Sequence, residues 1–344
     1  MRKLTRYWII IVGLIVTLIT SCNSVNTTPL PLIQQETQLV VERISNIATT
    51  PFFNTQGDLI YLEKQSESWN VKKNGITVAT FTGEILGAAF SADGRYLLLE
   101  TQIESGEQFL QLLDCQENSI KIVASGYFWF SWQDQRKFIY WGQPVENNSE
   151  FSLDIFYAAK LSDDNKISVD EVHLENLFLA GLPEEIMVSS DGKLLLIQSS
   201  GHVDVWKRDS SDSYTHLPKN YIDTVNVLLD PQSERRLILL NDMGTLMSIL
   251  IEEPEVPPKI LTDRVTQPLA WEPSGENLFY ASDNIEQGGS TIWKINLDSG
   301  SRIMLADASQ ISGKVIDLVI SPTNNQIAYL TISHRLETLT FLSQ

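Results

Sequence analysis

The side chains best suited to metal or nucleophile chemistry are a few histidines, two cysteines and one acidic run. The histidines are too scattered for metal-ligand spacing and are interpreted as solvated residues in turns or near strand ends: His173, His202, His216 and His334. Residues 162–165 (SDDN) have the composition of a calcium loop but lack the glycine and the final glutamate of an EF-hand, which favours a solvated turn. Cys115 follows an apolar segment and is expected to be a buried, unreactive thiol.

Motifs for catalysis and for nucleotide binding are missing from the sequence. It contains no G-x-S-x-G nucleophile elbow, no Walker loop and no G-x-G-x-x-G loop. The pair Gly288-Gly289 fits a turn between two strands. We therefore expect no catalytic residue, no cofactor and no metal, and we do not expect an enzyme.

Cys22 has the clearest chemical context of any residue in the chain. A basic segment (residues 2–6) precedes an apolar one (residues 8–19), and small residues (20–21) precede Cys22. This order is typical of a secretory signal, which predicts a signal peptide over residues 1–21. The apolar segment is shorter than the roughly 20 residues of a membrane-spanning helix, although an uncleaved anchor stays open as the alternative.

The residues Ile19-Thr20-Ser21-Cys22 resemble the bacterial lipobox. The resemblance implies cleavage before Cys22 and attachment of lipid to its sulfur, and two or more acyl chains hold a protein stably on a membrane. Asn23 follows where many retained inner-membrane lipoproteins have aspartate, so an outer-membrane destination is allowed. Residues 22–37 are then a lipidated tether, polar and proline-containing. We expect a membrane-anchored, extracytoplasmic protein, on the periplasmic side or at the outer membrane.

Composition narrows the choice of partner. The formal net charge is −18, and removal of the basic N-terminal segment makes the chain more acidic still. Such a surface repels phosphate backbones, so nucleic acid is not expected as a partner. If Cys22 carries lipid, Cys115 has no partner for an intrachain disulfide, and the fold depends on its apolar core.

The rest of the chain repeats one pattern, in which an apolar residue, a Ser, Asp, Asn or Pro turn with glycine, and a β-rich strand follow one another. Seven copies begin near Asn54, Ser91, Ser131, Ser189, Asp230, Glu272 and Ser321. Each copy predicts a tight β-hairpin in which glycine takes a positive φ, with Asn324 as its substitute in the last copy. Gln135 and Ser233 are poor substitutes, which predicts a different turn in those two copies. Most intervals are about 40 residues, the length of one four-stranded propeller blade.

Together these copies resemble the TolB-like, WD-repeat-like β-propeller family, whose hallmark is a serine-proline-aspartate-glycine turn in each blade. Ser321-Pro322 keeps the serine-proline pair. The resemblance covers residues 38–344 and implies an all-β fold, a seven-bladed propeller of four-stranded antiparallel blades. The last copy lacks a fourth strand, and residues 38–44 are a spare strand that we expect to close the ring.

Two features have both a structural and a functional interpretation. Aromatic residues gather in residues 127–132 (YFWFSW), with Tyr140 and Trp141 nearby. They either pack between blades or line a ligand platform, and alternation sends Phe128, Phe130 and Trp132 to one sheet face. The interval after the third copy holds about 16 extra residues, which we place within residues 161–181. This segment is either a recognition loop or a longer outer hairpin.

Two hypotheses about function follow. The first is a lipid-anchored, non-enzymatic protein-interaction or cell-envelope scaffold module with a protein partner of unknown identity. The alternative is a binding protein for a saccharide or peptide, or an enzyme, that uses the funnel at the ring axis. The fold alone does not choose between them.

Overall fold

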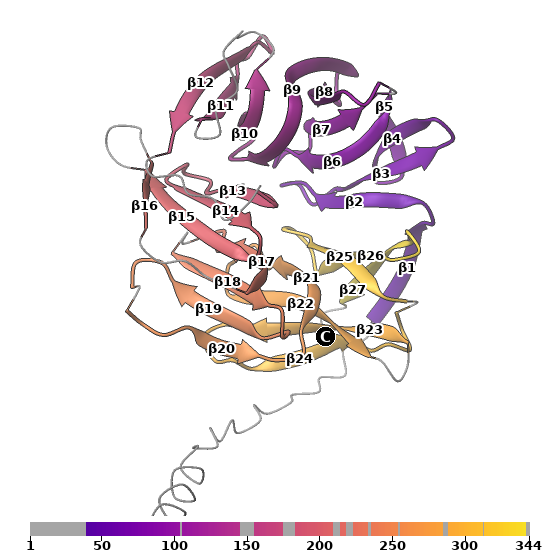
Figure 1. The fold of residues 1–344 in the computed structure, drawn as a ribbon. Coiled ribbons are helices and arrows are strands. Elements are labelled where there is room, and N and C mark those ends of the chain that lie inside the picture. Colours follow the sequence, from indigo (N-terminus) through magenta and orange to yellow (C-terminus); the bar gives the residue numbers. More distant parts are fainter. Residues whose placement is uncertain are drawn as a thin grey trace, which may run out of the picture. The chain divides into compact units, whose positions relative to one another are not determined.

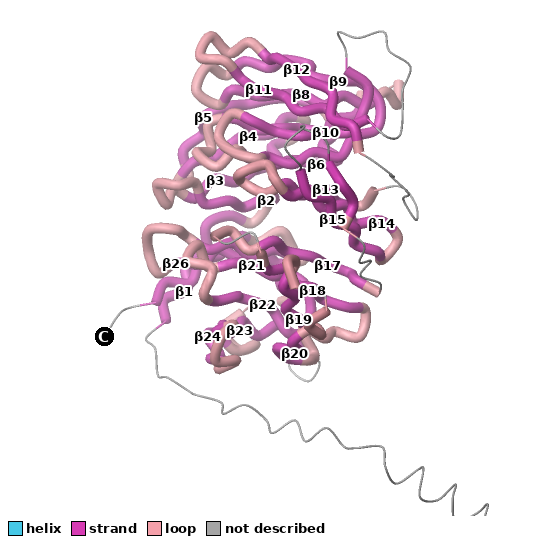
Figure 2. The backbone as a smooth tube through the Cα atoms, turned by 90° about the vertical axis from the view of Figure 1, so that its left-hand side faces the viewer, coloured by secondary structure: helices cyan, strands magenta, loops and turns pink. Residues whose placement is uncertain are grey.

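The computed structural model describes residues 39–103, 105–144, 155–174, 183–208, 214–217, 223–232, 235–253, 255–284, 288–311 and 313–341. The predicted signal peptide and tether, with Cys22, lie outside the described residues. Figure 2 shows strands and connecting loops throughout the described part. Among the residues described, no helix is long and apolar enough to cross a membrane.

The strands form a seven-bladed β-propeller of four-stranded antiparallel blades, as the sequence predicted. The blades follow one another around the ring in chain order, with the first strand of each blade nearest the centre (Figure 1). Blade 1 contains β2 (Ala48–Phe53), β3 (Leu59–Gln65), β4 (Ser68–Lys73) and β5 (Ile76–Thr82). Blade 2 contains β6 (Glu84–Phe90), β7 (Tyr96–Gln102), β8 (Gln108–Asp114) and the first part of β9 (Ser119–Trp132).

The strand β9 belongs to two blades, because its first part pairs with β8 and its second part pairs with β10. Blade 3 continues with β10 (Lys137–Pro144), β11 (Ile155–Leu161) and β12 (Ile167–His173). Blade 4 contains β13 (Glu185–Val188), β14 (Leu194–Ser199), β15 (His202–Arg208) and β16 (Tyr214–His216). Blade 5 contains β17 (Thr224–Leu229), β18 (Arg236–Asn241), β19 (Leu246–Leu250) and β20 (Lys259–Thr262).

The chain closes the ring with its own first strand. Blade 6 contains β21 (Thr266–Trp271), β22 (Asn277–Asn284), β23 (Gly289–Asn296) and β24 (Arg302–Ala306). Blade 7 contains β25 (Val315–Ile320), β26 (Gln326–Thr331), β27 (Leu336–Phe341) and, as its outermost strand, β1 (Leu39–Ser45). β1 pairs antiparallel with β27, from Leu39 opposite Phe341 to Ser45 opposite Leu336. The predicted closing strand is therefore confirmed, and the edge of β27 is covered.

The core lies between the blades rather than within them. Each of the seven blade interfaces contains one cluster of buried apolar side chains in the described part of the chain. The second strand of a blade is covered on both faces, and every residue of β14 is buried. This explains why these strands have continuous apolar runs, such as residues 96–99 and 194–197, in place of alternation.

The repeated hairpin turn has the predicted geometry in most copies. Gly57, Gly94, Gly192 and Gly275 all take a positive φ, between 71° and 84°. In blade 2, Ser91 Oγ donates to Asp93 Oδ1 at 2.7 Å and accepts the Tyr96 N–H at 2.9 Å, which fastens the turn. Gln135 has no positive φ, in agreement with a different turn there. Ser233 lies outside the described residues.

The prediction for Asn324 was wrong. This residue has no positive φ, and residues 322–325 form a bend without the hydrogen bond that closes the turns of blades 1, 2, 4 and 6. In blades 2 and 4 the serine is followed two positions later by Asp93 or Asp191, which accepts its hydroxyl proton. Blade 7 has Thr323 at that position, so Ser321 does not make this hydrogen bond to an aspartate.

Candidate functional site

The two faces of the ring differ in the residues they expose. One face, called here the hairpin face, carries the turns between the first and second strands of each blade. The other, called the bulged face, carries the starts of the inner strands and the turns between second and third strands. Five inner strands contain a register shift close to this face, at Thr49/Phe52, Ile85/Gly87, Thr224/Asn226, Thr266/Leu269 and Val315/Asp317. A bulge of this kind redirects a side chain away from the ladder.

Large aliphatic side chains are exposed on the bulged face. Three of them occupy the bulges, and four lie in connecting turns: Leu86, Val225 and Ile316, and then Ile47, Ile103, Met243 and Ile332. Met243 is 80% exposed and Ile332 is 64% exposed, so both side chains are accessible to a partner. The remaining exposed aliphatics lie around the circumference, on or beside the outer strands, as Ile76 and Ile260 do.

Backbone hydrogen bonds hold these turns in place. The Asp242 N–H donates to the Asp223 carbonyl at 3.1 Å, and the Gly244 carbonyl accepts from Val265 at 3.0 Å, so both neighbours of Met243 are fixed. Ile332 itself donates to the Lys314 carbonyl at 2.8 Å. The aliphatic side chains of the bulged face are thus presented by a rigid frame.

Acidic side chains outnumber basic ones in the described connections of the bulged face. The acidic residues are Glu67, Glu107, Glu184, Asp223, Asp242, Asp263 and Asp307, against Arg264, Lys314 and Arg335. Lys314 is neutralised by Asp283, with Nζ and Oδ2 2.8 Å apart. The face combines apolar contacts with negative charge.

A cavity of about 550 Å³ lies beside the inner strands of blades 2 to 4. Its lining includes Leu86, Glu100, Phe130 and Glu185. Water reaches Glu185, yet the surrounding strands desolvate its carboxylate and raise its pKa. On the inner strand of blade 7, burial likewise raises the pKa of Asp317 to about 6, against the lowering effect of the Leu318 N–H. These carboxylates are the most perturbed acids on the inner strands.

The aromatic residues of 127–132 pack mainly as core. Trp129 packs against Trp141 on the side of blade 4, with ring centroids 4.7 Å apart and ring planes tilted by 45°. Phe130 and Trp132 pack toward blade 2. The Trp132 indole N–H donates to the Ala89 carbonyl at 2.8 Å. The predicted alternation is confirmed for these residues, and the side chains of Tyr127 and Phe128 lie outside the description. Phe130 and the residues beside it also border the cavity of blades 2 to 4. These aromatic residues therefore form core between blades, and some of them line the cavity as well.

The other candidate residues stay apart from one another. His173 and His334 are exposed, His202 begins β15, and His216 Nε2 lies 3.1 Å from Asp204 Oδ1. Cys115 is buried, and burial raises its thiol pKa to about 12. Within the described residues, no three His, Cys, Asp or Glu side chains converge as a metal site.

The acidic residues 162–165 and the described part of the long interval after the third repeat copy belong to the sheet of blade 3. Residues 162–165 form the turn between β11 and β12, where Asn165 donates to Asp114 at 3.0 Å and accepts from the Tyr96 hydroxyl at 2.6 Å. Residues 167–173 are the regular outer strand β12, which favours the outer hairpin for that part of the interval. The rest of the predicted segment, residues 175–181, lies outside the described residues.

Comparison with known proteins supports the fold and no more. No protein-family model matches this chain, and no curated protein matches its sequence. Among solved structures, it is similar to the Cps50 (Swd1) β-propeller domain of Myceliophteria thermophila, with 13% identity, a TM-score of 0.58, and coverage of 88% of this chain and 98% of that one. A chain of a mitotic checkpoint complex gives 13% identity, a TM-score of 0.54, and coverage of 93% and 100%. The fold is a WD-repeat-like β-propeller.

Proposed function

We propose that this chain is a TolB-like bacterial lipoprotein, held outside the cytoplasm by lipid on Cys22, whose propeller is a non-enzymatic protein-interaction module of the cell envelope. The observation that carries the proposal is the set of exposed aliphatic residues on the bulged face. Exposed apolar patches of this kind mark interaction sites in soluble domains. Of the two similar folds, one comes from a multiprotein complex by its printed name, which is consistent with a protein partner.

The position of β1 is compatible with an anchor that leaves this face free. Leu39 pairs with Phe341, the last described residue, at the hairpin face, and Ser45 reaches the bulged face. The chain between Cys22 and Leu39 therefore joins the ring on the side opposite to Met243 and Ile332. A stretched tether of this length reaches roughly 50 Å. Entry of the chain at Leu39 therefore does not cover Met243 or Ile332.

The chemistry of the bulged face supports one class of protein partner. Aliphatic residues at the centre of an interface exclude water, while opposite charges at its edge steer association and set specificity. Because the face is acidic, we propose a protein partner whose apolar contact residues are surrounded by lysine and arginine. Nucleic acid does not fit this charge.

The test is site-specific photo-cross-linking in cells that make the full chain. A photoreactive amino acid replaces Met243 or Ile332 on the bulged face, and Ile76 or Ile260 on the circumference serves as a control of similar exposure. We expect a discrete cross-linked envelope protein from the two bulged-face positions and none from the controls. Identical products from all four positions, or no product from any, contradict the proposal.

The cavity beside blades 2 to 4 favours a second candidate, a small-ligand site near the ring axis. Its volume of about 550 Å³ falls within the range of small-molecule pockets. Glu185→Gln removes its perturbed carboxylate. A ligand of this cavity loses affinity in that variant, whereas cross-linking at Met243 does not change.

A further inference from the structure

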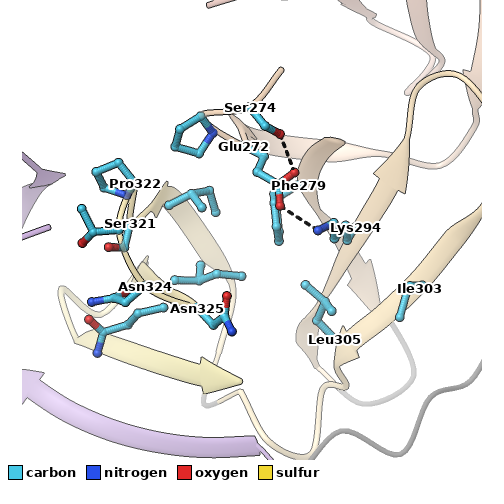
Figure 3. A pocket seen from close by; sticks show the side chains of 15 residues that line it. Glu272, Ser274, Phe279, Lys294, Ile303, Leu305, Ser321, Pro322, Asn324 and Asn325 are labelled. Carbon is cyan, nitrogen blue, oxygen red and sulfur yellow. Dashed lines mark hydrogen bonds and ion pairs between the residues drawn. The ribbon is translucent and has the colours of Figure 1, made fainter. Parts of the chain in front are cut away.

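A second cavity, of about 470 Å³, lies on the hairpin face between blades 6 and 7. One wall is the sheet face of blade 6, with Phe279 on β22, Lys294 on β23 and Leu305 on β24. The opposite wall is the hairpin of blade 7, including Asn324 and Asn325. Figure 3 shows these two walls facing each other across an open space.

The cavity occurs where the hairpins of neighbouring blades are not joined. Other pairs of neighbouring hairpins on this face are linked: the Thr55 N–H donates to the Ala92 carbonyl at 3.0 Å, and Gln232 Nε2 donates to the Pro273 carbonyl at 2.6 Å. Thr323 of blade 7 reaches blade 1 at the Gln56 carbonyl, 3.4 Å away. Between residues 272–274 and 321–325, all of them described, no hydrogen bond crosses the interface.

The altered turn of blade 7 leaves the hydroxyl of Ser321 without a hydrogen-bond partner. Ser321 borders the cavity, is 4% exposed, and its Oγ has no hydrogen-bond partner within the described protein. The equivalent Ser91 and Ser189 each fasten their own turn. This oxygen is closed to solvent and lies beside Gly57 of blade 1, so it marks the altered turn and is not a contact for a ligand of the cavity.

The charges in the cavity cancel. Lys294 Nζ lies 2.7 Å from Glu272 Oε1, and the Ser274 hydroxyl donates to Glu272 Oε2 at 2.9 Å. Burial alone pushes the pKa of Glu272 up, but hydrogen bonds from Asn277, Lys294 and Ser274 outweigh it and hold the pKa below its usual value. The pair is therefore ionised and internally neutral at neutral pH, which suits a ligand without net charge.

The apolar lining is aliphatic. Ile303, Leu305 and Ile320 are half-buried and face the cavity, in contrast to the fully buried clusters at the blade interfaces. Phe279 is 4% exposed, with Lys294 Nζ 5.4 Å from its ring centroid, so no aromatic face is free to stack on a sugar. This lining fits a branched aliphatic side chain.

The exposed carboxamides of Asn324 and Asn325 complete the site. A carboxamide donates and accepts at once, as a peptide group does. We infer that the cavity between blades 6 and 7 binds a short, uncharged peptide segment, with one aliphatic side chain against Ile303, Leu305 and Ile320 and its peptide groups on the two asparagines. This site is separate from the bulged face and does not depend on its partner.

The test measures binding of blocked peptides to the purified full chain in lipid nanodiscs. The probe is fluorescein-labelled Leu-Leu amide, followed by fluorescence polarisation, with Gly-Gly and Lys-Lys amides and chitobiose as unlabelled competitors beside unlabelled acetyl-Leu-Leu amide. We expect the leucine peptide to compete at least about tenfold better than the other three, which corresponds to about 1.4 kcal/mol. Chitobiose as the strongest competitor, or no saturable binding of the probe, overturns the inference.

Variants locate the binding. The double variant Asn324→Ala, Asn325→Ala removes two exposed side chains and leaves the core intact, and we expect it to weaken the leucine probe at least about fivefold. Gln135→Ala changes the corresponding hairpin position of blade 3 and should leave binding unchanged. Met243→Ser should also leave it unchanged, which separates this site from the bulged face. Equal affinity of the double variant and the unmodified chain overturns the inference.

Discussion

Arg43 on the first strand and Glu337 on the last lie with Nε and Oε1 3.3 Å apart, and this pair joins the two ends of the ring. Glu337 is 3% exposed, and its other oxygen, Oε2, accepts the Tyr329 hydroxyl at 2.6 Å. Burial, together with the hydrogen bond to Glu337, raises the pKa of Tyr329, so the phenol stays protonated and donates. The carboxylate therefore connects β1, β26 and β27 at the point of closure.

The first prediction concerns this closure. Glu337→Ala leaves the Tyr329 hydroxyl buried without an acceptor and should lower the free energy of unfolding by about 2–3 kcal/mol. Arg43→Ala should cost less, about 1 kcal/mol at most, because Arg43 is half exposed. Urea unfolding measures both. Arg235→Ala, at the exposed pair with Glu252, is the control. An equal effect of Glu337→Ala and Arg235→Ala would show that the ring does not depend on this carboxylate.

The sequence predicted the features that are local or strictly repeated. Gly94 and Gly192 marked the hairpins because a tight turn needs their conformation, and the continuous run at residues 194–197 marked a strand covered on both faces. The spare segment before the first copy identified the closing strand. These features depend on neighbouring residues or on the count of strands in a blade, and both can be obtained from the sequence.

No feature of the sequence predicted the exposed aliphatic residues of the bulged face. The sequences of the inner strands around Leu86, Val225 and Ile316 do not predict a bulge. A register shift against the neighbouring strand exposes each of these side chains.

The sequence likewise does not predict the cavity between blades 6 and 7. Asn324 stands where other copies have glycine, yet it has no positive φ. The residue before it does not explain this, because Gly57 and Gly275 take a positive φ after Gln56 and Ser274.

The second prediction compares two glycines with similar φ angles. A Cβ at Gly94 (φ +71°) would overlap Ile60 Cδ1 and lie 3.3 Å from Asn54 Cβ, whereas a Cβ at Gly75 (φ +81°) meets nothing within 4 Å. Both alanine variants carry the cost of a left-handed residue, about 1–2 kcal/mol. Gly94→Ala should lose about 1–2 kcal/mol more because of crowding. Urea unfolding midpoints measure the difference, and equal losses would mean that the blade 1–blade 2 contact is loose.

The third prediction concerns Asp317, whose folded-state pKa of about 6 lies above its ordinary 3.8. Between about pH 4 and 6 the native state keeps a proton that the unfolded chain releases, so the free energy of unfolding falls as pH rises through this window. Above pH 6 the carboxylate of Asp317 is ionised in the folded state, and its desolvation lowers the free energy of unfolding by the full amount. Asp317→Asn keeps an oxygen for the Leu318 N–H and removes the ionisation.

This variant should be more stable than the original chain at pH 7.5, by on the order of 2–3 kcal/mol, and the difference should vanish below pH 4. Denaturant unfolding at a series of pH values measures it. Asp298→Asn, at an exposed aspartate, is the control and should show no change with pH beyond that of the original chain. A difference for Asp317→Asn that is the same at pH 4 and pH 7.5 would contradict desolvation as the cause.

The last prediction tests the anchor with the two cysteines of the chain. Metabolic labelling with an alkyne-tagged palmitate in bacteria that make the full chain should mark the protein, and Cys22→Ser should abolish the label because no acceptor sulfur remains. Cys115→Ser should keep the label in full, since the thiol of Cys115 is buried and burial raises its pKa to about 12, which keeps it protonated and unreactive. Label that persists in Cys22→Ser, or that disappears in Cys115→Ser, removes the basis for a lipoprotein.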